Sequence, residues 1–398
     1  MKEKASGTYY KWVILFIIWI GMFSPNYTQY QLSPIAGDLM TAMGLSAAQF
    51  SSVFSAPMIP GLLLALITGS LFDRFGARKL CSIYMVIAAV STCLRVFSHN
   101  YMALFWSVFF SCLSATVLNT NGVKIIGTWF SPNQVPKVMA VFLASSTLAT
   151  TIAMGTTAFF PNVQTAFAAA AALAIIAALL MILLMRDRTI ETDPEAVQVP
   201  PPSVKESLKV VATSKGCWLI ALAYMFAYGS SLTLSQFLPS ALSSKGLDPV
   251  SAGAVGSLAS FGTLAGCFVP FFIGRLKNLK PLMFLCGAIA ALGAAFAWLL
   301  PAGILQNTVF FCVGIASGAG MPLLMIWPLK LKEIGLTYAG TAGGLLAMVG
   351  LFGAIVLPSY IIVPMAGNNY HLLFLMSGLC MALYVALAML LPNTAEKG

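Results

Sequence analysis

Polar side chains interrupt several long apolar runs of this sequence. Lys124 lies about 20 residues into one run, where a charge is costly in lipid and normally faces a cavity, a counter-ion or a substrate. Asn26, Gln29 and Tyr30 share one face of a helix in another run. Ammonium, amide and phenol groups hold a solute by hydrogen bonds, so the pattern indicates binding of a small molecule.

A second polar stripe lies in the latter half of the chain. Tyr224, Tyr228, Ser231 and Ser235 follow i, i+4, i+7, i+11 spacing, with Gln236 adjacent. Such groups are unfavourable toward lipid, so the two stripes face either a cavity or another helix. Hydrogen bonds between helices are the alternative to solute binding for both.

Acidic residues are missing from the same apolar runs. All 11 Asp and Glu lie in the connections, in the tails or at Asp73. A carboxylate within a span is the usual partner of a cationic substrate and the usual proton carrier. The sequence therefore disfavours cationic drugs and carboxylate relays, and favours a small anion attracted by Lys124 or a neutral solute held by amides and phenols.

Enzyme chemistry finds no support in the sequence. The eight cysteines form no CxxC pair and are expected to pack as small apolar residues. There is no metal-ligand cluster, no nucleophile beside a base and no glycine-rich phosphate loop. We expect neither a catalytic residue nor a metal or cofactor.

Composition explains why these runs exist. Only 8% of the 398 residues are charged and 59% are hydrophobic, against roughly 25% charged in soluble domains. The surface must therefore face lipid, and about 20 residues suffice for each spanning helix. We expect twelve spans, at about 12–35, 47–71, 79–97, 101–127, 136–160, 165–185, 217–241, 250–274, 281–300, 307–328, 338–363 and 370–391.

The net charge of +10 reflects membrane topology. All but two of the 21 Lys and Arg lie on alternate connections, the exceptions being Arg95 and Lys245. This asymmetry predicts that both termini are cytoplasmic, and it removes the need for a nucleic-acid partner. Arg95, at the outer end of the third span, is expected to anchor the helix by reaching toward the interface.

The two halves of the chain resemble each other at an offset of about 200 residues. Gly44-Leu45-Ser46 opens span 2 as Gly246-Leu247-Asp248 opens span 8, and Trp129 closes span 4 as Trp327 closes span 10. Such repeats are typical of transporters, with the substrate held where the halves meet. We expect a bundle over 1–185, a cytoplasmic linker over 186–216 with a short helix near 203–211, and a second bundle over 217–398.

The loop after span 2 carries a more specific signal. It reads Gly69-Ser70-Leu71-Phe72-Asp73-Arg74-Phe75-Gly76-Ala77-Arg78-Lys79 and resembles the GxxxDRxGRRK signature of the major facilitator superfamily, departing at Ala77. The resemblance implies an all-α integral membrane fold, with twelve transmembrane helices in two pseudo-symmetric six-helix bundles. It also implies a cytoplasmic latch formed by Gly69, Asp73, Arg74, Gly76 and Arg78, with Gly76 making a turn and Asp73 meeting a helix N-terminus.

Two further stretches resemble the organic-anion, nitrate and cyanate-type porters of this superfamily. They are Trp129-Phe130-Ser131-Pro132 and the glycine-rich stretch that begins at Ala339. Two departures weaken narrower interpretations. Nitrate porters carry an arginine within spans 2 and 8, and neither span has one here; the glycine-rich span 5 motif of proton-coupled drug antiporters is also missing.

In this family spans 1, 4, 7 and 10 line the central cavity. The resemblance therefore ranks the polar residues of these spans first. For Lys124 the alternative is that its side chain reaches to the nearby cytoplasmic interface. The predicted substrate-binding residues are Asn26, Tyr27, Gln29, Tyr30, Asn119, Asn121, Lys124, Tyr224, Tyr228, Ser231, Ser235, Gln236 and Trp327.

Together these features predict a monomeric transporter in the cytoplasmic (inner) membrane that moves a small, monocarboxylate-like organic anion by alternating access. Exchange with a counter-solute, facilitated diffusion and symport with a proton all remain open. The alternatives are a carrier of a neutral or hydrophobic molecule, and a membrane sensor that binds a ligand without moving it.

Overall fold

The computed structural model describes residues 2–131, 133–187, 204–269, 280–331, 333–335 and 337–391. Its internal contacts divide the chain into two compact units, Met1–Thr192 and Asp193–Gly398. Most of the expected linker, at 188–203, lies outside the described residues. Each unit is therefore described by itself.

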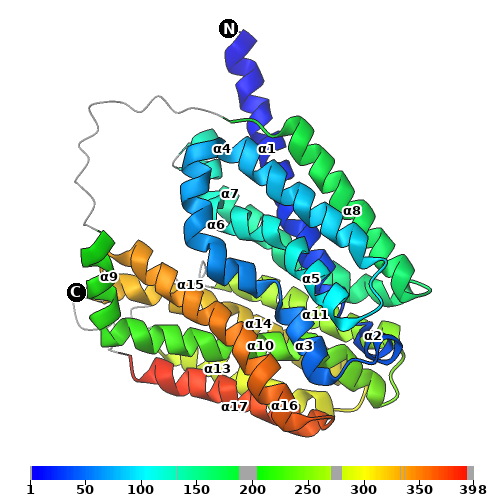
Figure 1. Ribbon diagram of the computed structural model, residues 1–398. Helices are drawn as coiled ribbons and strands as arrows, with labels where there is room; N and C mark the ends of the chain where they lie inside the picture. The colour runs from blue at the N-terminus through cyan, green and yellow to red at the C-terminus, as the bar shows by residue number, and fades with distance from the viewer. Residues whose placement is uncertain are drawn as a thin grey trace. The chain divides into compact units, whose positions relative to one another are not determined.

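The first unit is built from helices, shown from blue to green in Figure 1. Its core is an apolar cluster that includes Ile17, Val117, Phe142 and Met181. α1 packs against α7, α8 and α6, and α4 packs against α8, α6 and α5. The elements are α1 (Lys2–Tyr30), α2 (Ala36–Met43), α3 (Ala47–Ser55), α4 (Met58–Arg95), α5 (Tyr101–Ser111), α6 (Leu113–Trp129), α7 (Val135–Thr156), η1 (Thr157–Phe159) and α8 (Val163–Leu184).

The second unit is also helical, shown from green to red in Figure 1. Its core cluster includes Ile220, Leu324, Trp327 and Leu346. The elements are α9 (Val204–Thr213), α10 (Lys215–Ser244), α11 (Pro249–Cys267), α13 (Lys280–Phe296), η2 (Ala297–Leu299), α14 (Ile304–Ile326), η3 (Trp327–Lys330), α15 (Ala339–Val356), the π-helical η4 (Leu357–Ile362), α16 (Val363–Ala366) and α17 (Tyr370–Met389). α9 falls on the short helix expected near 203–211.

The two units pair their helices in the same way. The first span packs on the fifth in each unit, as α1 on α7 and as α10 on α15. The third span likewise packs on the sixth, as the end of α4 on α8 and as α13 on α17. A shared pairing pattern is what a duplicated six-helix unit produces, because each helix keeps the face that its neighbours fit.

The repeat extends to the turns that begin spans 2 and 8. Gly44 has φ 62° and Gly246 has φ 95°, a region in which glycine avoids the strain of a side chain. Two residues later Ser46 caps α3 by accepting from the Gln49 N–H, and Asp248 caps α11 by accepting from the Ser251 N–H. Hydrogen bonds from Ser251 also lower the pKa of the Asp248 carboxyl.

Within the described residues, ten helices are long and apolar enough to span a membrane, or eleven if one bent pair is a single span. α1 is long enough but is more polar, because lysines begin it and Asn-Tyr-Thr-Gln-Tyr ends it. α1, the bent pair and the ten helices fall on the twelve expected spans. The bent pair is span 2, where a 45° break separates Ala47–Ser55 from Met58–Leu64 around Pro57.

Two other expected boundaries differ from the structure. Span 4 is divided at Cys112, whose φ of −103° and ψ of 8° end α5 before α6 begins. The loop expected between spans 2 and 3 is helical, apart from one non-helical residue, Gly76. Hydropathy predicts where a span lies, but it does not show where a single residue within the span has non-helical backbone angles.

Candidate functional site

Two predicted residues lie on an exposed face of α6 in the first unit. Asn119 and Lys124 are both exposed, together with Thr120 and Val123 between them. The Lys124 Nζ lies 6.0 Å from the centroid of the Phe72 ring on α4. An amide and an ammonium group therefore lie on the exposed face of this helix.

The polar side chains near the end of α1 differ in burial: some contact other helices, and others are partly exposed. Gln29 is buried and donates from Nε2 to the Phe54 carbonyl on α3 at 2.9 Å, so it serves as a contact between helices. Asn26 is half-buried and donates to the Met22 carbonyl of its own helix at 2.7 Å. Tyr30 is half-buried against the Phe54 ring, with 5.4 Å between centroids, and Tyr27 is buried.

Three other predicted lining residues are fully buried. Asn121 donates from Nδ2 to the Val117 carbonyl at 3.1 Å, while its Oδ1 has no partner. Gln236 is buried in α10, and Trp327 lies inside the core cluster of the second unit. The tight turn η3 begins at Trp327, and its indole packs inward. These residues, like Gln29, present no surface to a solute in this structure.

The stripe on α10 remains partly accessible. Tyr224, Tyr228, Ser231 and Ser235 are all half-buried, and the two tyrosine rings lie 5.8 Å apart between centroids. The Tyr224 ring packs on Gly350 of α15, where an added Cβ would overlap it. The stripe thus combines two phenols and two hydroxyls on one face, as its spacing predicts.

Arg95 departs from its expected role as an interfacial anchor. Its side chain is fully buried, and its Nη1 donates to the Thr28 carbonyl of α1 at 2.7 Å. Its Nη2 donates to Gln31 Oε1 at 2.8 Å, and the guanidinium carbon lies 4.2 Å from the centroid of the Phe167 ring on α8. The expectation was wrong because the end of α1 offers acceptors inside the bundle that lipid headgroups would otherwise supply.

The latch segment is helical around one turn. Gly76 has φ 78° and ψ 167°, which is the turn that the sequence predicts. The Asp187 carboxylate accepts from the Arg78 backbone N–H at 2.9 Å, and an added Cβ at Gly76 would meet it at 3.0 Å. Arg74 and Arg78 are exposed, and the Arg74 guanidinium carbon lies 5.3 Å from the Phe75 ring centroid. The positions of Gly69 and Asp73 are helical, but the Asp73 side chain lies outside the described residues.

Sequence reasoning missed the roles of Asp187 and Arg95. Asp187 lies at the N-terminus of the helix that resumes after Gly76, where backbone N–H groups and the helix dipole favour a carboxylate. Its sequence signal was weak, because it stands at the start of a charged linker. For Arg95 the signal was a charge within a span, because such charges normally face the bundle interior and pair with other groups there.

The described residues contain no group of three or more His, Cys, Asp or Glu that could hold a metal ion. All eight cysteines are free. The long apolar helices, with polar and charged groups at a few positions, define the class of polytopic membrane proteins.

A comparison with family models agrees with this class. Residues 12–358 match the model of the Major Facilitator Superfamily, so the chain belongs to that family. It is a multi-pass membrane transporter and not an enzyme. The resemblance seen in the loop after span 2 is thereby confirmed.

Relatives and solved structures agree with the family. The chain is 26% identical over 335 residues to the nitrite extrusion protein of Bacillus subtilis, covering 81% of this chain and 79% of that one. It is 24% identical over 331 residues to the probable nitrate/nitrite transporter NarK2 of Mycobacterium tuberculosis, covering 81% of each. The fold is similar to a bacterial homologue of the lysosomal transporter Spinster, with a TM-score of 0.76, 15% identity and 96% of each chain covered. The nucleoside transporter NupG gives a TM-score of 0.72 at 16% identity, over 94% of this chain and 98% of that one.

Proposed function

We propose that this chain moves a small, singly charged anion across the cytoplasmic membrane by alternating access, and that Lys124 contacts the anion. The exposed Lys124 on α6 carries the proposal, since an ammonium group exposed on a spanning helix is unfavourable toward lipid and favourable toward an aqueous path. Asn119 on the same exposed face adds an amide donor. With all 11 acids outside the expected spans, the binding face has positive character.

Among anions we favour a monocarboxylate-like solute. A carboxylate has a planar, two-oxygen head that one ammonium and several neutral donors can hold. Asn26 and Tyr30 of α1, and Tyr224, Tyr228 and Ser235 of α10, supply such donors from half-buried positions. The absence of an arginine from spans 2 and 8 counts against strict likeness to nitrate porters.

Nitrite or nitrate is the second candidate, and the two relatives favour it. Nitrite shares the bent, planar, singly charged form of a carboxylate, so the same donors fit both. A neutral solute held by the phenols and hydroxyls of α10 is the third. In each case we propose a monomer in the inner membrane with both termini cytoplasmic, coupled to a proton or a counter-solute, as the charge asymmetry and the family suggest.

Uptake into proteoliposomes tests the proposal. The panel holds small carboxylates, their uncharged amide analogues, nitrite and nitrate, each with and without an inward proton gradient. We expect anion uptake, and we expect Lys124→Gln to lower it at least tenfold while sparing any amide uptake. The same change at Lys137, an exposed lysine of α7, is the control and should leave uptake unchanged. Equal loss of anion and amide uptake in Lys124→Gln would refute the contact.

We also propose that Gly69, Asp73, Arg74, Gly76 and Arg78 form the cytoplasmic latch that the family signature implies. Asp187 supports this segment by capping the helix that resumes after Gly76. Asp73→Asn should lower the maximal transport rate with little change in the half-saturating substrate concentration. A change in affinity alone would contradict a role in the conformational cycle.

A further inference from the structure

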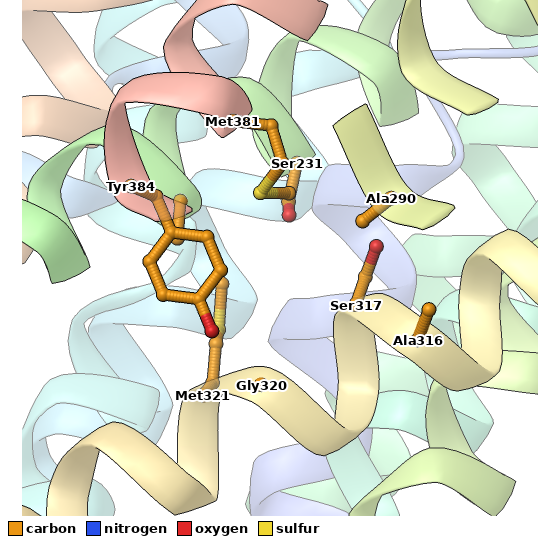
Figure 2. A pocket seen from close by; sticks show the side chains of 9 residues that line it. Ser231, Ala290, Ala316, Ser317, Gly320, Met321, Met381 and Tyr384 are labelled. Atoms are coloured by element: carbon orange, nitrogen blue, oxygen red, sulfur yellow. The ribbon is translucent and has the colours of Figure 1, made fainter. Parts of the chain in front are cut away.

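A small cavity lies inside the second unit, between α10, α13, α14 and α17 (Figure 2). Its volume is about 10 Å³, which is about the space that one water molecule needs. Most of the wall is apolar, with alanines and the thioether side chains of Met321 and Met381. None of the nine lining residues is charged, so the cavity does not suit an ion.

Within the described residues, two hydroxyl groups in this wall have no hydrogen-bond partner. Tyr384 is 2% exposed, and neither its Oη nor the buried Oγ of Ser231 meets a donor or acceptor there. They come from different helices, α17 and α10, and the hydroxyl of Ser317 on α14 is directed into the same space in Figure 2. A buried hydroxyl that gives up water without gaining a partner is unfavourable, and two around one cavity call for an occupant.

Gly320 of α14 keeps this space open. A Cβ at Gly320 would lie 2.9 Å from Tyr384 Oη. Because there is no side chain at this position, the phenol of Tyr384 can lie against α14 without being displaced. The cavity therefore exists because Gly320 has no side chain, and not because large side chains are loosely packed.

We propose that the cavity binds one small neutral molecule that both donates and accepts hydrogen bonds, namely a water molecule bridging Tyr384 Oη and Ser231 Oγ. A water can accept from one hydroxyl and donate to the other, and Ser317 offers a third partner. It links α17 and α14 to α10, the helix that carries the Tyr224 to Ser235 stripe. The site is a property of the second unit alone and holds whichever solute the protein transports.

Radiolytic hydroxyl-radical footprinting of the full-length protein, in buffer free of glycerol, tests this site. Radiolysis of a bound water molecule produces hydroxyl radicals next to the side chains that surround it. A buried methionine in contact with such a water is therefore oxidised quickly. Met381 is 3% exposed, and Met22 and Met181, at 2% and 0%, are matched controls packed in the apolar cluster of the first unit. We expect Met381 to be oxidised several times faster than the controls, with ¹⁸O from labelled water in the product. Equal rates would overturn the proposal.

Two variants give an independent measurement. Ser231→Ala/Tyr384→Phe removes both hydroxyls, and it should bring Met381 oxidation down to the rate of the controls. Tyr384→Phe alone separates a wet cavity from a dry one by the sign of its effect on Tm. Loss of a bridging water lowers Tm, whereas removal of a hydroxyl from a dry cavity leaves Tm unchanged or raises it, and the latter result would contradict the proposal.

Discussion

Arg95 and Lys124 are two basic residues within spanning helices of the same unit, and their side chains lie in opposite environments. Arg95 is fully buried and holds two oxygens of the α1 end with its planar guanidinium. Lys124 is exposed on α6, and its ammonium lies 6.0 Å from the Phe72 ring centroid. The contrast is between a guanidinium that links helices inside the bundle and an ammonium group on an exposed face.

The physical reason for the contrast lies in the acceptors. The last four carbonyls of a helix have no partner further along it, and Thr28 is within the last turn of α1. The negative end of the helix dipole and the face of Phe167 both favour a cation there. A guanidinium can use several such neighbours at once, whereas an ammonium is a compact, strongly hydrated charge.

Replacement of Arg95 should lower the stability of the first unit more than any other change proposed for these two basic residues. Arg95→Met leaves the Thr28 carbonyl and Gln31 Oε1 buried without donors, each at roughly 1–3 kcal/mol, partly offset because no charge is then buried. We expect a loss of about 2–4 kcal/mol, measured as a lower Tm in detergent. Arg95→Lys should recover less than half of that loss, because one ammonium cannot reproduce the fork. An unchanged Tm for Arg95→Met would show that the network does not stabilise the bundle.

A smaller effect is expected where the ring beside Arg95 is replaced. Phe167→Leu removes the aromatic face that lies 4.2 Å from the guanidinium carbon but keeps an apolar side chain. We expect a loss of about 1–2 kcal/mol from the cation–π contact and the altered packing. The same replacement at Phe142, a buried ring of α7 in the apolar core cluster of the first unit, serves as a control for packing alone. Equal losses of stability for Phe167→Leu and Phe142→Leu would show that the Arg95 guanidinium gains nothing from the Phe167 ring.

The smallest effect on stability is expected at Lys124. Because its side chain is exposed, Lys124→Gln should change the free energy of unfolding by less than about 0.5 kcal/mol while it lowers anion uptake. Thermal denaturation of the variant beside the transport assay measures both. A marked fall in Tm for Lys124→Gln would contradict the division between a buried and an exposed cation.

The sequence predicted the architecture well, because hydropathy and charge asymmetry act on whole segments. The bundle pattern, the family and the paired turns at Gly44 and Gly246 all followed from it. The substrate-binding residues remain a prediction, and the structure places them in different surroundings. Asn119 and Lys124 are exposed on one face of α6, but Gln29 and Trp327 are buried. The prediction of a cytoplasmic latch is tested by the Asp73→Asn variant above.

Side-chain direction explains that difference. The spanning helices are apolar on nearly every side, so the sequence does not show which face meets lipid, a neighbour or water. Gln29 is buried because α3 brings the Phe54 carbonyl within reach, and α3 does so only where the chain bends around Pro57. No spacing rule within α1 reports that bend.

By itself the sequence determined that the chain is a multi-pass membrane transporter with a duplicated helical unit. Hydropathy, charge placement and the repeated motifs are properties of the residues themselves and do not depend on how the helices pack. Only the tertiary structure decided that Arg95 is an internal cap, that Asp187 meets the helix after Gly76, and that Tyr384 and Ser231 share a cavity. Each of these depends on atoms more than 60 residues apart in the chain, and such contacts exist only when helices pack.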